Sequence, residues 1–270
     1  FTGRRHIGPG TGGETMALSA GDVDNDGDID IVAGDLGGQN AIYKQDGGEF
    51  DITSNFGPGT DQTYGLALGD LNGDGFIDGA LAQYNLNNAA YLNDRAGNFT
   101  GTTFSLQRCK DVALGDFNGD GSLDYLISGD LNVRVIFFNN GAGGYSHTSD
   151  FASVTNTPTD LAIGDTDGDG DLDVAVTNDG NVQHVVYLND GVGNMNAGTD
   201  NYATGAVNGR GVVFGDIDGD GDLDVGTANY RNQNWFDLND GAGNFIGTPN
   251  NFGTGSDASS ELALGDIDGD

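Results

Sequence analysis

A nine-residue acidic loop recurs along this chain and constrains its fold more than any other feature. The first copy runs from Asp22 to Asp30, with aspartate at every odd position and glycine at position 6. Further copies begin at Asp70, Asp116, Asp165, Asp216 and Asp266, the last of them incomplete. Their spacing of 46 to 51 residues, together with a second marker after each glycine-rich turn, defines a repeat of about 49 residues. The chain is therefore an array of similar units.

The five complete loops indicate which positions bind a cation through their side chains. Positions 1, 5 and 9 always carry aspartate, and position 3 carries aspartate or asparagine. Position 7 varies and includes Phe76, so we expect its backbone carbonyl to be the ligand. Hard oxygen donors at this density suit Ca²⁺, which takes six to eight of them. Position 6 is always glycine, as a turn with positive φ requires, and position 8 is always isoleucine or leucine, which we expect to plug into the core.

We predict at least five calcium sites, one for each complete loop. The expected positions in these sites are Asp22, Asp24, Asp26, Asp28 and Asp30; Asp70, Asn72, Asp74, Phe76 and Asp78; Asp116, Asn118, Asp120, Ser122 and Asp124; Asp165, Asp167, Asp169, Asp171 and Asp173; and Asp216, Asp218, Asp220, Asp222 and Asp224. A sixth site is expected to begin with Asp266, Asp268 and Asp270. The alternative, solvated Asp-Gly turns without metal, does not explain five copies of one ligand pattern.

The loop opens like an EF-hand loop but does not continue as one. The first six residues follow D-x-[DN]-x-D-G in both cases. An EF-hand then needs a bidentate glutamate at position 12. That position holds Ala33, Leu81, Ile127, Val176 and Thr227. Short apolar runs typical of strands follow the loops where an EF-hand has a helix, so we exclude the EF-hand and dockerin classes.

The charge balance excludes several kinds of partner. The chain has 9 lysines and arginines against 42 acidic residues, a net charge of −33. So few cations cannot neutralise a nucleic-acid backbone or an anionic membrane surface. No apolar run of about 18 residues exists, so we also expect no membrane insertion. More than half of the acidic residues lie in the loops, and we therefore reject disorder on the condition that metal is present.

Calcium and cysteine content together predict a location outside the cell. Acidic loop sites of this weak kind fill at roughly 0.1–1 mM Ca²⁺, a concentration found in extracellular fluids. A single cysteine, Cys109, excludes an intrachain disulfide framework. We therefore expect a secreted or cell-surface protein. Because Phe1 is not an initiator methionine and Asp270 interrupts a loop, we expect both ends to be the limits of a fragment or of a processed chain.

Within a repeat, short apolar segments alternate with turns and show no helical period. In the second unit we predict strands at 64–68, 77–82, 89–92 and 99–104. Hairpin turns rich in Asn, Asp and Gly are expected at 93–98, 139–144, 189–194 and 239–244. Four antiparallel strands per unit, repeated along the chain, predict an all-β fold, a β-propeller of four-stranded blades. We predict one domain over residues 1–270, with repeats at about 16–61, 62–107, 108–157, 158–208 and 209–258 and partial units at 1–15 and 259–270.

These units resemble FG-GAP/VCBS repeats, which occur in the integrin α-subunit head, in calcium-dependent fungal lectins and in many secreted bacterial proteins. The resemblance rests on five D-x-[DN]-x-D-G-x-x-D loops and covers the whole chain. Phrases such as VVYLNDGVGN at 185–194 are most similar to the bacterial members. The resemblance implies β-propellers, most often seven-bladed, with Ca²⁺ bound in the hairpin between the first two strands of a blade. Five to six blades are visible in this sequence.

No motif in the chain predicts catalysis. The sequence has no GxSxG or HExxH, and we interpret His6, His147 and His184 as exposed polar residues because they lie far apart in the repeat. A glycosidase carboxylate pair is not excluded by counting, but none stands out beyond the metal loops. Arg108 and Lys110 flank Cys109 and could lower its pKa; a buried, inert thiol is the favoured interpretation.

The topology of a propeller blade suggests where a partner would bind. The metal loops and Asn/Gly hairpins fall on one face, whereas the opposite face is formed by the other loops. That opposite face is rich in aromatic, amide and arginine residues, the types used in sugar or protein recognition. Its candidate ligand-binding residues are Tyr84, Arg134, His184, Tyr230, Arg231 and Trp235. The alternative, that Trp235 only packs between blades, remains open.

Three functions are compatible with these patterns. The leading hypothesis is a non-enzymatic, extracellular, calcium-stabilised propeller that binds a protein or glycan in adhesion. A second is a non-catalytic propeller within a secreted polysaccharide-active or phospholipase-type enzyme. A third is an architectural unit that associates with copies of itself in a filament or adhesin.

Overall fold

A computed structural model of the chain describes residues 13–46, 49–104, 108–130, 133–151, 157–180, 182–197, 202, 207–245, 250–253, 255 and 258–265. These residues form strands, turns and loops but no helix, and therefore no helix that could cross a membrane. The expected sixth site at Asp266, Asp268 and Asp270 lies outside the described residues, as does His6.

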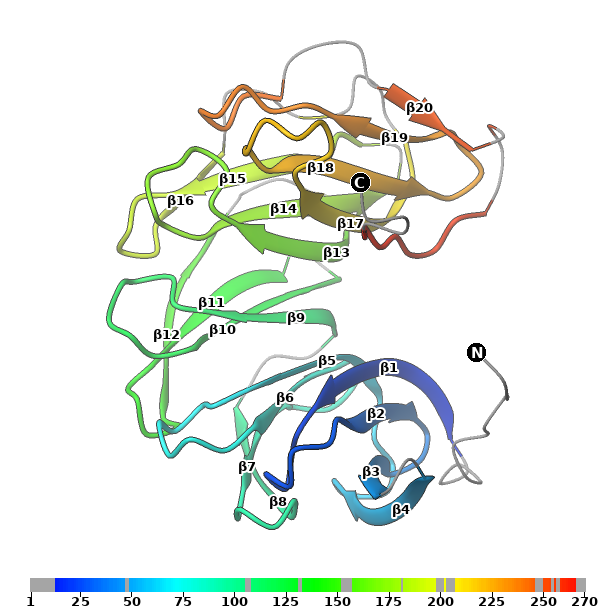
Figure 1. Cartoon of the computed structure of the whole chain (residues 1–270), viewed down its shortest axis with the longest axis vertical. Coiled ribbons are helices and arrows are strands. Elements are labelled where there is room, and N and C mark those ends of the chain that lie inside the picture. The colour runs from blue at the N-terminus through cyan, green and yellow to red at the C-terminus, as the bar shows by residue number, and fades with distance from the viewer. Residues whose placement is uncertain are drawn as a thin grey trace. The chain divides into compact units, whose positions relative to one another are not determined.

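The described residues form five four-stranded sheets, one sheet to each repeat, and neighbouring strands in a sheet follow the order of the chain (Figure 1). The first sheet contains β1 (Glu14–Gly21), β2 (Asp30–Leu36), β3 (Asn40–Asp46) and β4 (Glu49–Phe56). The second contains β5 (Thr63–Gly69), β6 (Asp78–Gln83), β7 (Asn88–Asn93) and β8 (Phe99–Phe104). The third contains β9 (Cys109–Gly115), β10 (Asp124–Gly129), β11 (Val133–Asn139) and β12 (Tyr145–Asp150). The fourth contains β13 (Thr157–Gly164), β14 (Asp173–Asp179), β15 (Val185–Asn189) and β16 (Met195–Ala197), and the fifth contains β17 (Gly209–Gly215), β18 (Asp224–Asn229), β19 (Asn234–Asp237) and β20 (Asn250–Phe252).

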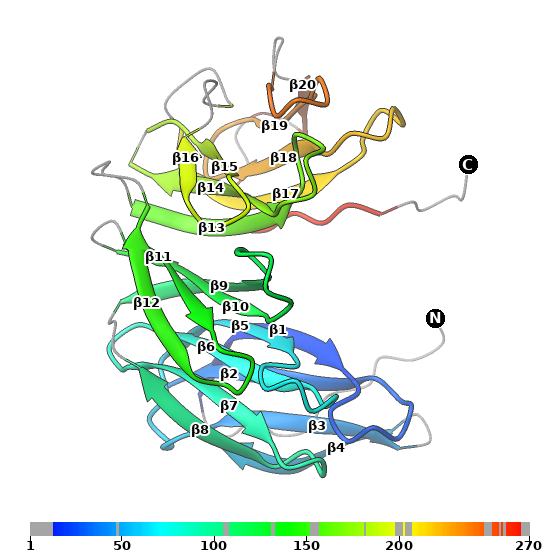
Figure 2. The same cartoon turned by 90° about the vertical axis from the view of Figure 1, so that its left-hand side faces the viewer.

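Each acidic loop joins the first and second strands of its sheet, as the family resemblance implied. The glycine before position 1 pairs with the aspartate at position 9, as in Gly21 with Asp30 and Gly164 with Asp173. The hairpin between the third and fourth strands returns to the same end of the sheet. In the fourth sheet, β13 to β16 lie next to one another in chain order (Figure 2). The loop and the hairpin of one repeat are thus neighbours.

In the second and fifth sheets, side-chain burial falls from the second strand towards the fourth. The second strands β6, β10 and β18 are buried along their whole length. Their sequences are nearly continuous runs of small and apolar residues, because both faces of the strand are covered. By contrast, the central residues of β8 are exposed.

The chain divides into two compact units, which we describe separately. Unit 1 comprises Phe1–Leu114, Gly121–Ile127 and Phe137–His147, and unit 2 comprises Gly115–Asp120, Ser128–Ile136 and Thr148–Asp270. In unit 1, β5 packs against β1 and β2; in unit 2, β17 packs against β13 and β14. The same packing mode therefore recurs within both units.

Position 8 of the loop packs against a glycine of the preceding sheet. A Cβ atom at Gly21 would lie 2.9 Å from Cδ1 of Ile77, and one at Gly164 would lie 2.7 Å from Cδ1 of Leu223. Leu123 and Leu172 occupy equivalent positions. The expected apolar plug is thus confirmed in these four repeats. In the first repeat the expectation is wrong, because Ile29 is 55% exposed.

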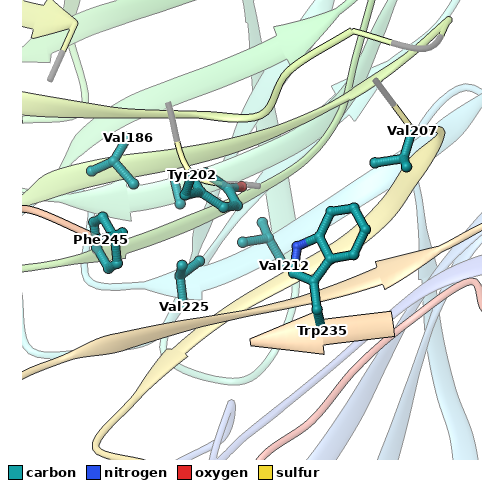
Figure 3. Close-up of a cluster of buried hydrophobic side chains, with 8 residues drawn as sticks. Val186, Tyr202, Val207, Val212, Val225, Trp235 and Phe245 are labelled. Atoms are coloured by element: carbon teal, nitrogen blue, oxygen red, sulfur yellow. The ribbon is translucent and has the colours of Figure 1, made fainter. Parts of the chain in front are cut away.

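An apolar core cluster of unit 2 contains Trp235 (Figure 3). In this view Trp235, on β19, lies beside Val212, and the cluster continues through Val225 and Tyr202 to Phe245. Large aromatic side chains contribute most of the buried area in such a core. Because the described residues contain strands but no helix, the all-β class is confirmed. The same residues contain no closed sheet, so the propeller and its blade number stay predictions.

Candidate metal centres

Position 1 of each loop holds the loop backbone in its turn. In the first loop, Oδ1 of Asp22 accepts a hydrogen bond from the backbone N–H of Asp26, and Oδ2 accepts one from Gly27. The position-6 glycines also donate to position 1 in the loops that begin at Asp70, Asp165 and Asp216. The φ values of these glycines lie between 87° and 100°, a region that favours glycine, as the sequence predicted.

Position 9 is the buried anchor of the site. The side chains of Asp30, Asp78, Asp124, Asp173 and Asp224 are all 0% exposed. In Asp78, Oδ2 accepts a hydrogen bond from the N–H of Leu71 at position 2, and Oδ1 accepts one from Asn93 at the end of the third strand. The same pair of bonds recurs in three other loops. One carboxylate therefore ties together the start of the loop, the second strand and the third strand.

Three loops bring the carboxylates of positions 1, 3 and 9 close together. One oxygen from each lies within 4.8 Å of the others in the groups Asp22, Asp24 and Asp30; Asp165, Asp167 and Asp173; and Asp216, Asp218 and Asp224. In the loops that begin at Asp70 and Asp116, position 3 is asparagine, so an amide oxygen replaces the third carboxylate. An oxygen-only donor set with a buried anchor fits Ca²⁺ better than a thiophilic or imidazole-binding metal.

Positions 5 and 7 do not join these groups. The position-5 carboxylate instead accepts a hydrogen bond from the backbone N–H of position 7, as in Asp26 with Asp28 and Asp169 with Asp171. Phe76 makes the same backbone bond to Asp74, although its side chain has no ligand atom. The backbone of position 7 is thus held in the same way in these loops, whatever its side chain. The role of its carbonyl as a ligand stays a prediction.

Burial and the charge of neighbouring carboxylates disfavour the ionised form of Asp78, Asp167 and Asp173. Burial raises the pKa of Asp78 to about 6, and the nearby charges of Asp74 and Asp70 add to the effect. The pKa of Asp173 is also raised, mainly by burial. Burial, followed by the charges of Asp173 and Asp169, raises the pKa of Asp167. A divalent cation among these groups would compensate for their charge, and its binding would require their deprotonation.

In four repeats, an asparagine at or just after the end of the third strand connects a loop to the preceding one. Nδ2 of Asn139 donates hydrogen bonds to the carbonyl of Leu71, 2.7 Å away in the preceding loop, and to that of Leu123, 3.0 Å away in its own loop. Its Oδ1 accepts a bond from the N–H of Gly141 in the hairpin. The side chains of Asn93, Asn189 and Asn239 donate to the preceding loop in the same way. We call these four residues the asparagine latch.

Sequence reasoning missed the asparagine latch. Each hairpin turn begins with an asparagine, and that recurrence was the available signal. A hairpin accounts for such an asparagine without any long-range partner, so the pattern by itself indicates turn formation alone. The latch shows that a loop, its own sheet and the next sheet form one hydrogen-bonded system.

The structure places half of the expected ligand-binding residues in the interior. Arg134 and His184 are 0% exposed and Trp235 is 7% exposed. Nη2 of Arg134 donates to Oδ1 of Asn178, and Nδ1 of His184 accepts from the N–H of Asn178. Burial lowers the pKa of His184 to about 4, which keeps the imidazole neutral. His184 is therefore not the exposed polar residue we expected, and all three side chains are covered by the rest of the protein.

The other expected ligand-binding residues are accessible. Tyr84 is half-buried, and its ring centroid lies 5.3 Å from that of Tyr64. The ring of Tyr230 contacts two guanidinium groups, that of Arg231 at 4.9 Å and that of Arg210 at 5.5 Å from its centroid. The backbone N–H groups of Tyr84 and Tyr230 donate to the carbonyls of Gln62 and Asn208, so both tyrosines are positioned by equivalent loops.

Cys109 is the buried thiol that the sequence favoured. Its side chain is 0% exposed, and Nδ2 of Asn88 donates a hydrogen bond to its Sγ. Burial raises the pKa of this thiol to about 11. A neutral, inaccessible thiol is a poor nucleophile, so Cys109 has a packing role.

A buried carboxylate outside the loops gives the metal-free protein an unusual pH dependence. Asp61 is 0% exposed, accepts a bond from Nε2 of Gln83, and has a pKa raised by burial to about 6, against about 3.9 in an unfolded chain. The folded state therefore binds more protons between pH 4 and 6, so this group lowers stability as pH rises through that window.

We expect Asp61→Asn to remove about 2 kcal/mol of the stability difference between pH 4.5 and pH 7 in EGTA. Urea unfolding of both proteins at the two pH values measures this. Identical pH profiles for the variant and the parent would contradict the assignment to Asp61, because both proteins share every other titrating group.

Comparison with known proteins supports this description of the repeats. The family model for the FG-GAP-like repeat matches residues 22–80, 116–176 and 165–227, which together cover more than half of the chain. A search of curated proteins found no match. Among 111 matching solved chains is the V. cholerae biofilm matrix protein Bap1, with a TM-score of 0.54 and 17% identity. The alignment covers 87% of this chain and 39% of that one, and at this identity it shows likeness of fold alone. By its matched repeats and their acidic loops, the chain belongs to the FG-GAP-like repeat family.

Proposed function

We propose that this chain is an extracellular, calcium-stabilised repeat module that binds a protein or glycan partner and has no catalytic role of its own. One observation carries the calcium assignment. In three loops, carboxylates from positions 1, 3 and 9 converge within 4.8 Å, each time between the first two strands of a sheet. Membership of the FG-GAP-like family and the fold shared with a biofilm matrix protein support the extracellular setting.

The role of calcium in this proposal is structural. The ion would be held by oxygens that already organise the loop, and it would offset the cost of burying position 9. Through the asparagine latch, four of the five complete loops are also connected to the sheet of the next repeat, as Leu71 is to Asn139. Stabilising one loop would therefore stabilise the packing of two sheets. We further propose that the sheets are blades of a propeller.

Calcium is expected to raise the melting temperature strongly. With at least five sites, we expect the midpoint in 2 mM CaCl₂ to exceed that in EGTA by more than about 10 °C, since ligand binding to the folded state adds to stability by mass action. Magnesium, which prefers smaller octahedral sites, is expected to give much less. Equal midpoints in calcium and EGTA would exclude the calcium assignment.

The partner is proposed to bind at the ends of the sheets opposite the acidic loops. In unit 2 the exposed Arg231 stacks on Tyr230, and in unit 1 Tyr64 and Tyr84 form a half-exposed aromatic pair. Aromatic rings and guanidinium groups are the residue types that dominate recognition surfaces. We expect Arg231→Ala and Tyr84→Ala to weaken binding of a partner without changing the calcium-dependent melting temperature.

Binding to a glycan array in calcium, with EGTA as the control, tests the recognition hypothesis. No binding to glycans, combined with calcium-dependent assembly seen by light scattering, would favour the architectural alternative. The enzyme-associated alternative requires a catalytic domain elsewhere in a longer protein. The present chain would then be expected to bind the substrate of that domain.

A further inference from the structure

The first loop differs from its siblings because it has a lysine of its own. Nζ of Lys44, on β3, lies 3.2 Å from Oδ2 of Asp24, the position-3 carboxylate of the first candidate metal centre. The two side chains are only 19% and 20% exposed, so solvent screens this pair less than a surface ion pair. The same ammonium donates a hydrogen bond to the carbonyl of Ala96, 2.6 Å away in the hairpin of the second repeat.

The position of Lys44 in the repeat is otherwise apolar. Lys44 precedes Gln45, whose backbone N–H donates to Asp30 at position 9. The residues at the equivalent position of the other repeats are Leu92, Phe138, Leu188 and Leu238. Leu92 packs on the hairpin glycine Gly143, and the side chain of Lys44 passes over the equivalent Gly97. The lysine therefore keeps the packing role of its stem and adds a charge next to the loop.

We infer that Lys44 is a built-in counter-ion of the first loop, which makes this loop the weakest calcium site among the three that have carboxylates at positions 1, 3 and 9. The inference rests on the proposed calcium binding. An ammonium against Asp24 repels a divalent cation and lowers the effective charge of the ligand set, and ligand charge strongly tunes calcium affinity. It also holds the loop to the second repeat without metal.

In the described part of the second loop, the nearest comparable ion pair is much more exposed to solvent. Nε of Arg95 lies 3.8 Å from Oδ2 of Asp74, but the arginine side chain is 63% exposed, and its guanidinium stacks on the ring of Phe76. An exposed pair at this distance contributes little in water. Asp74 is moreover at position 5, outside the converging carboxylates.

The fourth loop offers a reciprocal experiment. A Cβ atom at Gly243 would lie 2.9 Å from Leu188 and 3.3 Å from Cβ of Asp167, so residue 188 lies close to position 3 of its own loop. Leu188→Lys would therefore transfer the counter-ion to a loop that lacks it. Lys44→Met removes the charge while keeping an unbranched stem. Lys110→Met, on β9 away from the loops, is the matched control for the change in net charge.

The test is calorimetric titration of each protein with Ca²⁺ at constant ionic strength, with melting curves in EGTA. We expect Lys44→Met to raise the affinity of one site about tenfold and to lower the melting temperature in EGTA by about 2–4 °C. Leu188→Lys is expected to weaken one site about tenfold, and Lys110→Met to leave every calcium affinity unchanged. In an Asp22→Asn background, where the first site is disabled, Lys44→Met is expected to lose its effect on affinity.

The outcomes separate this inference from the proposed function. If the parent protein binds no calcium, the proposed function fails. If the parent binds calcium but Lys44→Met and Lys44→Gln both leave every affinity unchanged, the inference is overturned and the calcium assignment stands. A change of equal size in Lys110→Met would also overturn it, because the effect would then reflect net charge. Melting in calcium verifies that each variant folds.

Discussion

Replacing Asp173 by alanine is expected to reduce the free energy of unfolding by about 4 kcal/mol in calcium. This carboxylate, at position 9 of the fourth loop, is 0% exposed. It accepts hydrogen bonds from the backbone N–H and the hydroxyl of Thr166 and from the N–H of Asn189. Alanine would leave two buried N–H groups and one hydroxyl without acceptors, at a cost of about 1–3 kcal/mol each before relaxation.

The effect is expected to be smaller in EGTA. Burial raises the pKa of Asp173, so its charge is costly when no cation compensates for it, and removing the carboxylate relieves that cost. Denaturant unfolding in calcium and in EGTA separates the two contributions, because only the first includes the loss of a metal ligand.

Asp171→Ala in the same loop is the matched control. Position 7 supplies no side-chain ligand in the proposed site, since Phe76 occupies it in the second repeat. We expect a change within about 0.5 kcal/mol. Equal losses in the two variants would show that the loop responds to total charge, and would contradict the distinct role of position 9.

The second large effect is expected from Asn139→Asp in the asparagine latch. The amide nitrogen of Asn139 donates to two carbonyl oxygens, those of Leu71 and Leu123, and the residue is 3% exposed. Aspartate has the same shape but would place a carboxylate oxygen against both carbonyls. We expect a loss of about 3 kcal/mol at pH 7, from two broken hydrogen bonds and a buried, unpaired charge.

The neighbouring Asn140→Asp is a control of identical chemistry. Asn140 is exposed, and its Oδ1 accepts hydrogen bonds from the N–H groups of Ala142 and Gly144. Aspartate can accept the same two bonds, and the other hairpins already carry aspartate here, at Asp94, Asp190 and Asp240. We expect Asn140→Asp to be neutral. Urea unfolding of both variants measures the contrast.

The pH dependence of Asn139→Asp provides an internal check. The new carboxyl would have a folded-state pKa raised by burial, so its penalty is present above that pKa and is lost as pH falls through it. The stability gap to the parent is therefore expected to narrow between pH 7 and pH 4.5. A gap that stays constant with pH would argue that steric strain, and not charge, causes the loss.

Much of the local structure could be predicted from the sequence because the repeat supplies five copies of each element. The strands expected in the second repeat agree with β5 to β8, and the acidic loop lies between the first two strands. Position-6 glycine has positive φ in all five complete loops, as a left-handed turn requires. These features depend on residues close in the chain, where turn chemistry and apolar patterning determine the backbone.

The candidate ligand-binding face was predicted less well. Arg134, His184 and Trp235 are residue types common in recognition surfaces, yet all three are buried in unit 2. In the sequence, their exposure could be inferred only from their expected position in loops. Burial depends on what the neighbouring sheet covers, and here His184 and Trp235 lie beside each other, with ring centroids 6.3 Å apart.

The sequence by itself determined the repeat, the strands, the loop chemistry and the family, because each follows from residues within one period. Only the tertiary structure showed the contacts between periods. These contacts are the asparagine latch from Asn139 to Leu71, the packing of Ile77 on Gly21, and the ammonium of Lys44 at Asp24. In the sequence, a latch asparagine cannot be distinguished from an ordinary turn residue, or Lys44 from an ordinary surface lysine. Their partners are assigned by the packing of one sheet on the next, which no spacing within a single repeat specifies.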